Sequence, residues 1–366
     1  MSLENAIPHL IRVLVADDSA FMRTALTRMI ESDPSLRVVG TAQTGLEALE
    51  KLTSLQPDVV TLDVEMPRLN GLETLKRIMQ ESPRPVIMVS SLTQEGAQTT
   101  LEALDYGAFD YLPKQLSYAS LDIIKIREDL VAKIHAAAES RRKHFVRRPP
   151  SSIPLAPVIS AQCYQPAPTV IAIGTSTGGP KALQQILPMF PEDFPVPIVI
   201  VQHMPVGFTG PFAHRLDNLC KISVREAVHE EPLQPGFAYI APAGQHLTVA
   251  RRASKVVTRI SGQPADTLHI PSVDVMMTSI AEIFRALAMG IIMTGMGNDG
   301  ALGMQAIYRE GGLTLGQDES TCTVWGMPRS CAEMGVLKRV APLLSIPQQV
   351  LKAINYRPRS SAAAHL

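Results

Sequence analysis

The chain has no excess of either charge, because its 34 Lys and Arg residues balance its 34 Asp and Glu residues over 366 positions. A protein that binds nucleic acid or an anionic membrane through its overall field carries a basic excess, so any such binding here would have to be local. We therefore predict no nucleic-acid partner. Hydrophobic residues make up 46% of the chain and charged residues 19%, which indicates a folded globular protein.

Long apolar runs and a leader segment are also missing. The longest uncharged apolar stretch towards the C-terminus, residues 287–297, contains glycines. It is too short to span a hydrocarbon layer of about 30 Å. Residues 1–11 have no basic start, and Asp17 and Asp18 follow soon after, which is not typical of a secretory signal. We expect no membrane insertion and a cytoplasmic location.

Cysteine is scarce, and no two cysteines have C-x-x-C spacing. This excludes the usual zinc-binding patterns and a disulfide scaffold. We predict free thiols at all four positions, which are Cys163, Cys220, Cys322 and Cys331.

Acidic residues are absent from residues 140–191, and six of the twenty residues from Pro149 to Pro168 are proline. Proline stiffens the backbone and cannot donate a hydrogen bond, so this stretch predicts a semi-rigid linker. The length of the chain also favours two domains. We predict a first domain at 1–138, a linker at 139–168, a second domain at 169–356 and a flexible tail at 357–366.

Short β-branched runs alternate with amphipathic stretches on both sides of the linker. This alternation predicts an α/β protein with a doubly wound parallel sheet in each domain, the second domain being the larger. The predicted strands are residues 12–15, 38–40, 59–62, 86–89 and 111–112 before the linker, and residues 170–173, 197–201, 239–241 and 290–293 after it.

Acidic residues end two strands of the first domain. Asp17 and Asp18 follow the first strand and Asp63 follows the third, so their carboxylates should meet at one sheet edge, where Mg²⁺ would offset their repulsion. Ser90 ends the fourth strand, and Lys114 follows the fifth. Together these groups suit phosphoryl transfer to Asp63. Each aspartate alone could instead cap a helix or open a turn.

This set of residues resembles the receiver domain of two-component response regulators over about residues 10 to 135. The resemblance implies a flavodoxin-like fold and a sensor histidine kinase as phosphodonor. It implies Asp63 as phosphoacceptor, Asp17, Asp18 and Asp63 as Mg²⁺ ligands, Ser90 as the switch hydroxyl and Lys114 as a contact of the phosphoryl group. One departure is Gln115, which stands where receivers usually have proline after the lysine.

The first predicted strand of the second domain leads into G-T-S-T-G-G-P at residues 174–180. The motif contains G-x-S-x-G, a sharp strand-to-helix turn that would expose the Ser176 hydroxyl and aim backbone N–H groups at a developing oxyanion. A glycine-rich turn of this kind also binds phosphates or dinucleotides. However, Lys181 is not followed by Ser or Thr, and G-x-G-x-x-G is absent.

A serine nucleophile needs a base and a carboxylate that orients it. Two later strands end in Q-H-M-P, with His203, and in M-T-G-M-G-N-D-G, with Asp299. Three strands would thus bring Ser176, His203 and Asp299 to one edge, in a chain order that differs from that of α/β-hydrolases. His246 and His269, in loops with glycine or proline, compete for the role of base; we interpret them as pocket-lining or structural residues.

With H-I-P-S-V-D and V-W-G-M-P added, the motifs make the whole chain similar to the chemotaxis response-regulator protein-glutamate methylesterases. The resemblance implies Ser176 as nucleophile, His203 as base and Asp299 as its partner. It also implies oxyanion donors on the backbone near Thr177 and Met296, and no cofactor in the esterase site.

The resemblance further implies the reaction and its control. The enzyme would hydrolyse glutamate methyl esters of methyl-accepting chemotaxis receptors and deamidate receptor glutamines, with the unphosphorylated receiver blocking access. The same chemistry in another signalling pathway, or a ligand-binding regulator without esterase activity, stays open. A transcriptional regulator is disfavoured, because it would need a small basic helix-turn-helix domain.

Overall fold

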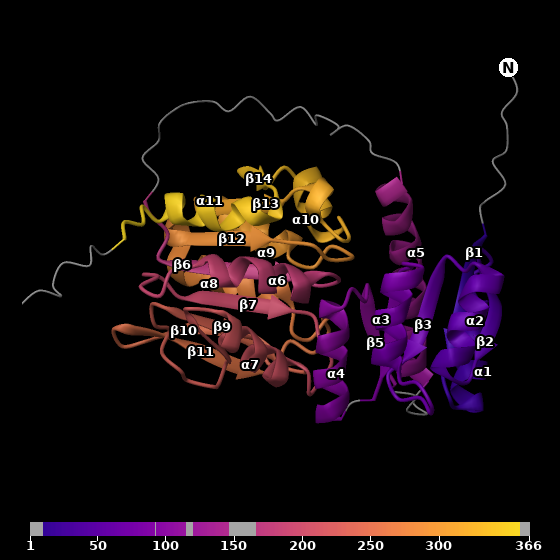
Figure 1. Ribbon diagram of the computed structural model, residues 1–366. Coiled ribbons are helices and arrows are strands. Elements are labelled where there is room, and N and C mark those ends of the chain that lie inside the picture. Colours follow the sequence, from indigo (N-terminus) through magenta and orange to yellow (C-terminus); the bar gives the residue numbers. More distant parts are fainter. Residues whose placement is uncertain (1–9, 92, 115–119, 146–165, 359–366) are drawn as a thin grey trace, which may run out of the picture. The chain divides into compact units, whose positions relative to one another are not determined.

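The computed structural model describes residues 10–91, 93–114, 120–145 and 166–358 (Figure 1). The chain forms two compact units, Met1–Pro149 and Pro150–Leu366. Gln115, Cys163, most of the predicted linker and the tail from residue 359 lie outside the described residues.

The first unit contains a five-stranded parallel sheet with the strand order β2-β1-β3-β4-β5. Its strands are β1 (Ile11–Ala16), β2 (Leu36–Ala42), β3 (Val59–Asp63), β4 (Val86–Ser90) and β5 (Asp110–Pro113). Its helices are α1 (Ala20–Ile30), α2 (Gly45–Leu55), α3 (Gly71–Glu81), α4 (Gln94–Asp105) and α5 (Ser120–Phe145). All five predicted strands are confirmed, and the order is the flavodoxin-like one.

Side-chain caps begin the first four helices of this unit. In each case a Ser, Thr or Asn side chain accepts a hydrogen bond from a backbone N–H of the first turn, which satisfies a donor that the helix leaves open. The four caps are Ser19, Thr44, Asn70 and Thr93. Helices α1 and α5 cover one face of the sheet through a buried cluster that includes Leu26, Ile30, Leu130 and Ile134.

Helix α5 continues to Phe145, past the boundary predicted at residue 138. Residues 139–145 contain no glycine or proline, so no residue there ends the helix. Within this stretch Arg141 Nη1 donates to Asp58 Oδ1 at 3.1 Å and to the Pro57 carbonyl at 3.2 Å. The beginning of the predicted linker is therefore helical.

The second unit contains a seven-stranded parallel sheet with the order β14-β13-β12-β6-β7-β9-β8. The strands are β6 (Val170–Thr175), β7 (Ile198–Gln202), β8 (Ser223–Glu226), β9 (Phe237–Ile240), β12 (Ala288–Ile292), β13 (Leu313–Gln317) and β14 (Arg339–Ala341). The four predicted strands are confirmed as β6, β7, β9 and β12. The other three extend the sheet at its two sides.

Helices follow most of these strands. The α-helices are α6 (Gly179–Ile186), α7 (Thr209–Leu219), α8 (Val273–Phe284), α9 (Ala301–Arg309), α10 (Met327–Glu333) and α11 (Ile346–Ala353). Short 3₁₀ turns occur at Leu187–Met189, Arg285–Leu287, Glu319–Thr321 and Leu343–Ser345. A buried cluster joins α8, α9 and α10 to the sheet through Met276, Ile280, Met304, Ile307 and Cys331.

An antiparallel hairpin, β10 (His246–Arg252) and β11 (Lys255–Ser261), lies outside the seven-stranded sheet. Strand β10 contacts α8 and buries Leu247 and Val249. Ala253 in the two-residue turn has φ of +51°, the left-handed backbone that hairpin turns of this length use. This hairpin was not predicted from the sequence.

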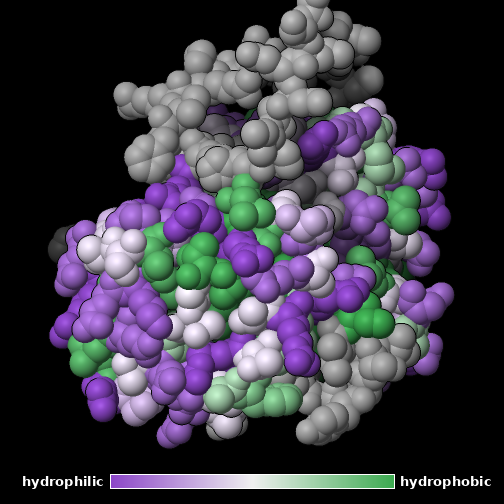
Figure 2. Space-filling view, turned by 90° about the vertical axis from the view of Figure 1, so that its right-hand side faces the viewer, coloured by the Kyte–Doolittle hydropathy of each residue, from purple (hydrophilic) through white to green (hydrophobic). Residues whose placement is uncertain are grey.

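Within the described part of the chain, we find no helix that is both long and apolar enough to cross a membrane. On the face that Figure 2 shows, hydrophilic side chains dominate and hydrophobic ones form separate small patches. Scattered apolar residues of this kind are normal on the surface of a folded protein.

Candidate functional site

The strand order of the second unit has a topological switch point at the carboxyl end of β6. The chain passes from β6 to β7 on one side and later returns to β12 on the other, and open α/β sheets bind ligands at such a switch point. Ser176 follows β6 and His203 follows β7, directly after the register pair Thr175 and Gln202. Asp299 lies in the loop between β12 and α9. The structure thus brings the three predicted residues to one edge.

Glycines allow the tight turn that carries Ser176. Gly178 has φ of +76°, a left-handed conformation that favours glycine. A Cβ on Gly179 would lie 2.0 Å from Gln202 Oε1, so a side chain there would push into the end of β7. The Ser176 N–H donates to the Thr294 carbonyl at 3.0 Å, and the Gly179 N–H donates to the Ser176 carbonyl at 2.8 Å. The backbone of the turn is therefore fixed.

His203 and Asp299 form a close pair. His203 Nε2 lies 2.8 Å from Asp299 Oδ2, and the two side chains are 9% and 10% exposed. The other ring nitrogen, Nδ1, is buried and has no hydrogen-bond partner among the described residues. One ring nitrogen is therefore held by a carboxylate, and the other has no hydrogen bond within the described residues.

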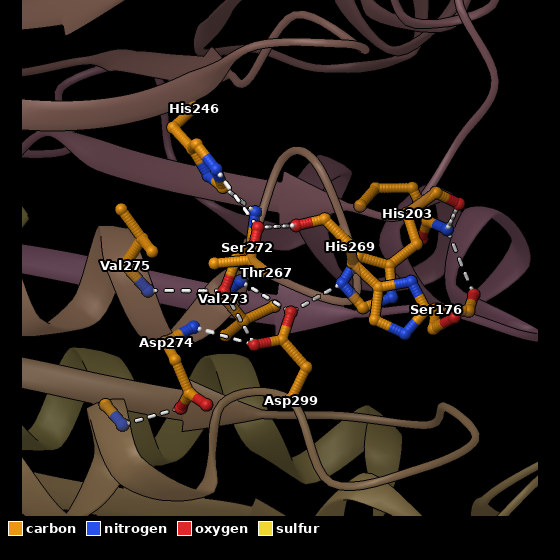
Figure 3. Close-up of polar contacts among 12 residues, drawn as sticks. Ser176, His203, His246, Thr267, His269, Ser272, Val273, Asp274, Val275 and Asp299 are labelled. Carbon is orange, nitrogen blue, oxygen red and sulfur yellow. Dashed lines mark hydrogen bonds and ion pairs between the residues drawn. The ribbon is translucent and has the colours of Figure 1, made fainter. Parts of the chain in front are cut away.

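Asp299 accepts three further hydrogen bonds at the N-terminus of α8 (Figure 3). The Ser272 hydroxyl donates to Oδ1 at 2.8 Å, the Val273 N–H to Oδ2 at 2.7 Å and the Asp274 N–H to Oδ1 at 3.0 Å. Burial opposes ionisation, but the hydrogen bond and charge of His203 and the backbone donors hold the pKa of Asp299 below its usual range. Asp299 is thus a carboxylate at neutral pH.

The two competing histidines have other contacts. His246 is buried; its Nδ1 accepts from the Ser272 N–H at 3.1 Å, and its Nε2 lies 2.9 Å from the Pro264 carbonyl. The ring of His269 stacks on that of His203, with centroids 4.1 Å apart and an angle of 21° (Figure 3). These contacts fit the interpretation of His246 as structural and of His269 as pocket-lining.

The segments expected to supply oxyanion donors are held by their neighbours. The Thr294 hydroxyl donates to the Thr177 carbonyl at 2.9 Å. Beside Met296, the Gly295 N–H donates to the carbonyl of Val324, a residue of the V-W-G-M-P motif, at 3.0 Å. Both segments thus have a defined backbone next to Ser176.

Ser272 and Gln202 were not predicted as site residues. Both lie in sequence motifs of the second domain, H-I-P-S-V-D and Q-H-M-P. A serine directly before an apolar helical run is a signal for a helix cap, and a glutamine at the end of an otherwise apolar strand is a signal for a buried polar role.

The first unit gathers its predicted acidic residues. Asp17, Asp18 and Asp63 offer carboxylate oxygens within 4.8 Å of one another. Lys114 Nζ lies 2.6 Å from Asp63 Oδ2 and 3.2 Å from Asp17 Oδ2. Burial raises the pKa of Asp63 to about 6. The hydrogen bond from Lys114 lowers this pKa, and the negative charge of Asp17 raises it.

The hydroxyl of Ser90 has different partners. It is buried and donates to the Gly96 carbonyl at 3.1 Å and to the Ser91 carbonyl at 3.2 Å. Gly96 lies in the first turn of α4. Ser90 therefore contacts the beginning of α4 rather than the carboxylates.

The acidic cluster fits a divalent cation. The Oδ2 atoms of Asp17 and Asp63 are buried, and the Lys114 ammonium lies beside both of them. Three carboxylates against one ammonium leave negative charge in excess. Hard oxygen ligands are those that Mg²⁺ prefers, so the residues present fit this ion.

Both units of the chain are similar to known protein families. Residues 171–350 match the family model of the CheB methylesterase, and residues 13–124 match that of the response regulator receiver domain. A protein-glutamate methylesterase/protein-glutamine glutaminase of Oleidesulfovibrio alaskensis is 45% identical over 367 residues, covering 94% of this chain and 100% of the relative. One of the same name from Pyrococcus horikoshii is 45% identical over 344 residues, covering 94% of each chain.

A solved structure matches the second unit. The crystal structure of the Thermotoga maritima CheB methylesterase catalytic domain has 39% sequence identity and a TM-score of 0.50. The match covers 51% of this chain and 98% of that one. The residues that match the family model, 171–350, include Ser176, His203 and Asp299.

Proposed function

Because this chain belongs to the CheB methylesterase family and has a response regulator receiver domain, we propose that it demethylates glutamate esters and deamidates glutamines of methyl-accepting chemotaxis receptors. Its relatives are named as protein-glutamate methylesterases and protein-glutamine glutaminases. One observation carries the assignment of residues: His203 Nε2 is bound to Asp299, while Nδ1 is left without a partner in the described part of the chain.

In the proposed acylation step, Ser176 Oγ attacks the γ-carbonyl carbon of the ester and its proton passes to His203 Nδ1. Asp299 stabilises the imidazolium through Nε2. Backbone N–H groups near Thr177 and Met296 would bind the oxyanion. When the bond to the methoxy group breaks, His203 returns the proton and methanol leaves.

Deacylation repeats these steps with water. Water gives a proton to His203, attacks the glutamyl ester of Ser176, and the serine leaves with the proton from the ring. The product is a free receptor glutamate. With a glutamine substrate, ammonia leaves in place of methanol.

We assign phosphorylation to the receiver unit. A carboxylate oxygen of Asp63 would attack the phosphorus of a phosphohistidine on a sensor histidine kinase, breaking its P–N bond. Mg²⁺ held by Asp17, Asp18 and Asp63 would offset the charge of the transferred group. Lys114 would contact the phosphoryl oxygens, and Ser90 would exchange its bond to Gly96 for one of them. A kinase of this kind would meet the chain in the cytoplasm.

The proposed consequence is activation. A new dianionic group would pull Ser90 away from the first turn of α4, and this change would release the block that the unphosphorylated receiver would impose in this proposal.

The test measures methanol release from methylated chemoreceptor membranes, with and without a small phosphodonor and Mg²⁺. Wild type should be stimulated by the phosphodonor. Ser176→Ala should lose about 10⁴-fold in turnover. Asp63→Ala should keep basal release and lose the stimulation. Absence of release from the wild type with the phosphodonor present would contradict the proposal.

A further inference from the structure

Gln202 is the one polar residue of strand β7, whose sequence is I-V-I-V-Q. It is 1% exposed, at the end of a strand that is buried along its whole length. Parallel strands of this kind are normally apolar throughout, and burying a carboxamide costs free energy unless its groups are hydrogen-bonded. The contacts of this side chain therefore call for an explanation.

The carboxamide joins the two residues that carry the proposed chemistry. Gln202 Nε2 donates to the Ser176 carbonyl at 3.0 Å and to the His203 carbonyl at 2.9 Å. Ser176 follows β6 and His203 follows β7, so a single NH₂ group bridges the ends of two strands. Both of its hydrogens are used.

The orientation of the carboxamide is determined by its surroundings. Carbonyl oxygens only accept, so the NH₂ group must face the Ser176 and His203 carbonyls. The other end, Oε1, is buried with no hydrogen-bond partner among the described residues and lies against Gly179. A rotation of the side chain would place Oε1 against two acceptors, so this arrangement is fixed.

No main-chain hydrogen bond among the described residues joins Ser176 directly to His203, and Gln202 provides such a link. Ser176 is held on the β12 side by Thr294, and His203 is held by its N–H bond to the Thr175 carbonyl at 3.1 Å. The carboxamide adds a bond to the carbonyl of each residue and so links the two directly. A displacement of about 1 Å between reacting groups can cost about 100-fold in rate.

We propose that Gln202 is a positioning residue, whose carboxamide sets the position of the Ser176 hydroxyl relative to the His203 ring. This inference rests on the proposed function, in which these two residues are nucleophile and base. In this inference Gln202 sets the distance between the two residues and does not contact the substrate.

The first measurement is the rate at which a fluorophosphonate labels Ser176 in the full chain. This probe reports the reactivity of the serine without any receptor. Gln202→Met keeps the length of the side chain and removes both donors, and should slow labelling about 10- to 100-fold. Gln202→Glu keeps the shape of the side chain, has at most one donor, and should also slow labelling.

The second measurement is methanol release from receptor membranes. Because Gln202 makes no proposed substrate contact, kcat should fall with the labelling rate while KM stays within about threefold of wild type. A purely structural role would lower thermal stability without this division between kcat and KM.

Thr258→Val is a matched control. Thr258 is a fully buried strand residue whose hydroxyl donates to the Val228 carbonyl at 2.5 Å and accepts from the Glu231 N–H at 3.0 Å. The loss of this hydroxyl removes two hydrogen bonds of a buried residue that lies outside the proposed triad. Below its unfolding temperature, this variant should be labelled at the wild-type rate.

The inference is overturned if a folded Gln202→Met or Gln202→Glu is labelled as fast as wild type. Equal slowing in Thr258→Val would also overturn it, because a general loss of stability would then explain the effect. If wild type is labelled but releases no methanol from receptors, the proposed function fails, and the labelling rates still decide the role of Gln202.

Discussion

Asp299 illustrates at the residue scale how the site is held. Its carboxylate accepts four hydrogen bonds, from the His203 ring, the Ser272 hydroxyl and the first two backbone N–H groups of α8. These donors keep the group ionised and fix its plane, and a base in a triad depends on both properties of its partner. The helix N-terminus adds a favourable partial charge.

The first prediction concerns Ser272→Ala. The change removes one donor to Asp299 and the cap that the hydroxyl provides to the Val275 N–H at 3.3 Å. A hydrogen bond to a charged group contributes about 1.5–3 kcal/mol, so we expect kcat for methanol release to fall about 10-fold or more. Ser272→Thr keeps the hydroxyl and should retain more activity. A wild-type kcat for Ser272→Ala would mean that the backbone donors suffice.

The second prediction concerns pH and Asp299. Its pKa is lowered in the folded state, whereas an unfolded aspartate titrates near 4. The stabilisation is therefore complete above about pH 4 and is lost as pH falls through the lower folded pKa. Asp299→Asn lacks this contribution, so its free energy of unfolding should change less between about pH 5 and pH 3. Urea unfolding of both proteins at these pH values measures the difference. The same change in the free energy of unfolding with pH in both proteins would contradict the prediction.

At the scale of elements, α9 takes its cap from another helix. It begins after Gly300, which has no side chain to cap it. Asp274 in α8 accepts from the Gly303 N–H at 2.7 Å instead. Burial raises the pKa of Asp274, and the charge of Asp299 adds to the rise. The same turn of α8 thus serves the proposed active site and the start of α9.

The third prediction separates the cap from the charge of Asp274. Asp274→Ala removes the acceptor and should lower the free energy of unfolding by about 1 kcal/mol. Asp274→Asn keeps an acceptor oxygen and removes the repulsion with Asp299, so it should stay near wild type at neutral pH. Chemical denaturation measures both. Equal losses in the two variants would show that the charge, and not the acceptor, matters to α9.

Most of the missed strands differ from the predicted ones in burial. The exception is β13, which is buried along its length, but its sequence L-T-L-G-Q is not a continuous apolar run. Strands such as β6 and β12 are buried on both faces and read as continuous apolar runs. Strands β8 and β14 are short and partly exposed, so their sequences lack that signal. The β10–β11 hairpin turns through Ala253 and Ser254 without the Asn-Gly or Asp-Gly pair that marks such turns.

Most of the predicted site residues lie directly at or after strand ends, whereas Asp299 lies in the loop between β12 and α9. Ser176, His203 and Asp63 could be found because parallel strands bring their carboxyl ends together. The contact of Ser272 with Asp299 joins residues 27 positions apart through the packing of α8 against a loop. No local pattern encodes that packing, so sequence alone could not assign the contact.

At the scale of the whole molecule, the two proposed chemistries lie on separately packed units. The core of the first unit draws on α1, α5 and its own sheet, and that of the second on α8, α9 and α10 with its sheet. Neither described cluster contains a residue of the other unit. Each unit can therefore have a stability of its own.

The last prediction uses this separation. Mg²⁺ binding to the acidic cluster should stabilise the first unit; at ten times its dissociation constant the gain is about 1.4 kcal/mol. The single tryptophan, Trp325, lies in the second unit, so its fluorescence follows the unfolding of that unit alone, whereas far-ultraviolet circular dichroism follows both. Added Mg²⁺ should raise the midpoint of one dichroism transition and leave the Trp325 midpoint unchanged. Asp63→Ala should weaken the shift.

The two possible Trp325 results have different consequences for regulation. An unchanged midpoint means that the metal ion alone does not couple the units, so activation must come from the phosphoryl group on Asp63. A midpoint that rises with Mg²⁺ in wild type and not in Asp63→Ala would contradict the prediction, because stabilisation at the acidic cluster would then reach the esterase unit without phosphorylation. Adding the phosphodonor to the same samples separates the contribution of the ion from that of the phosphoryl group.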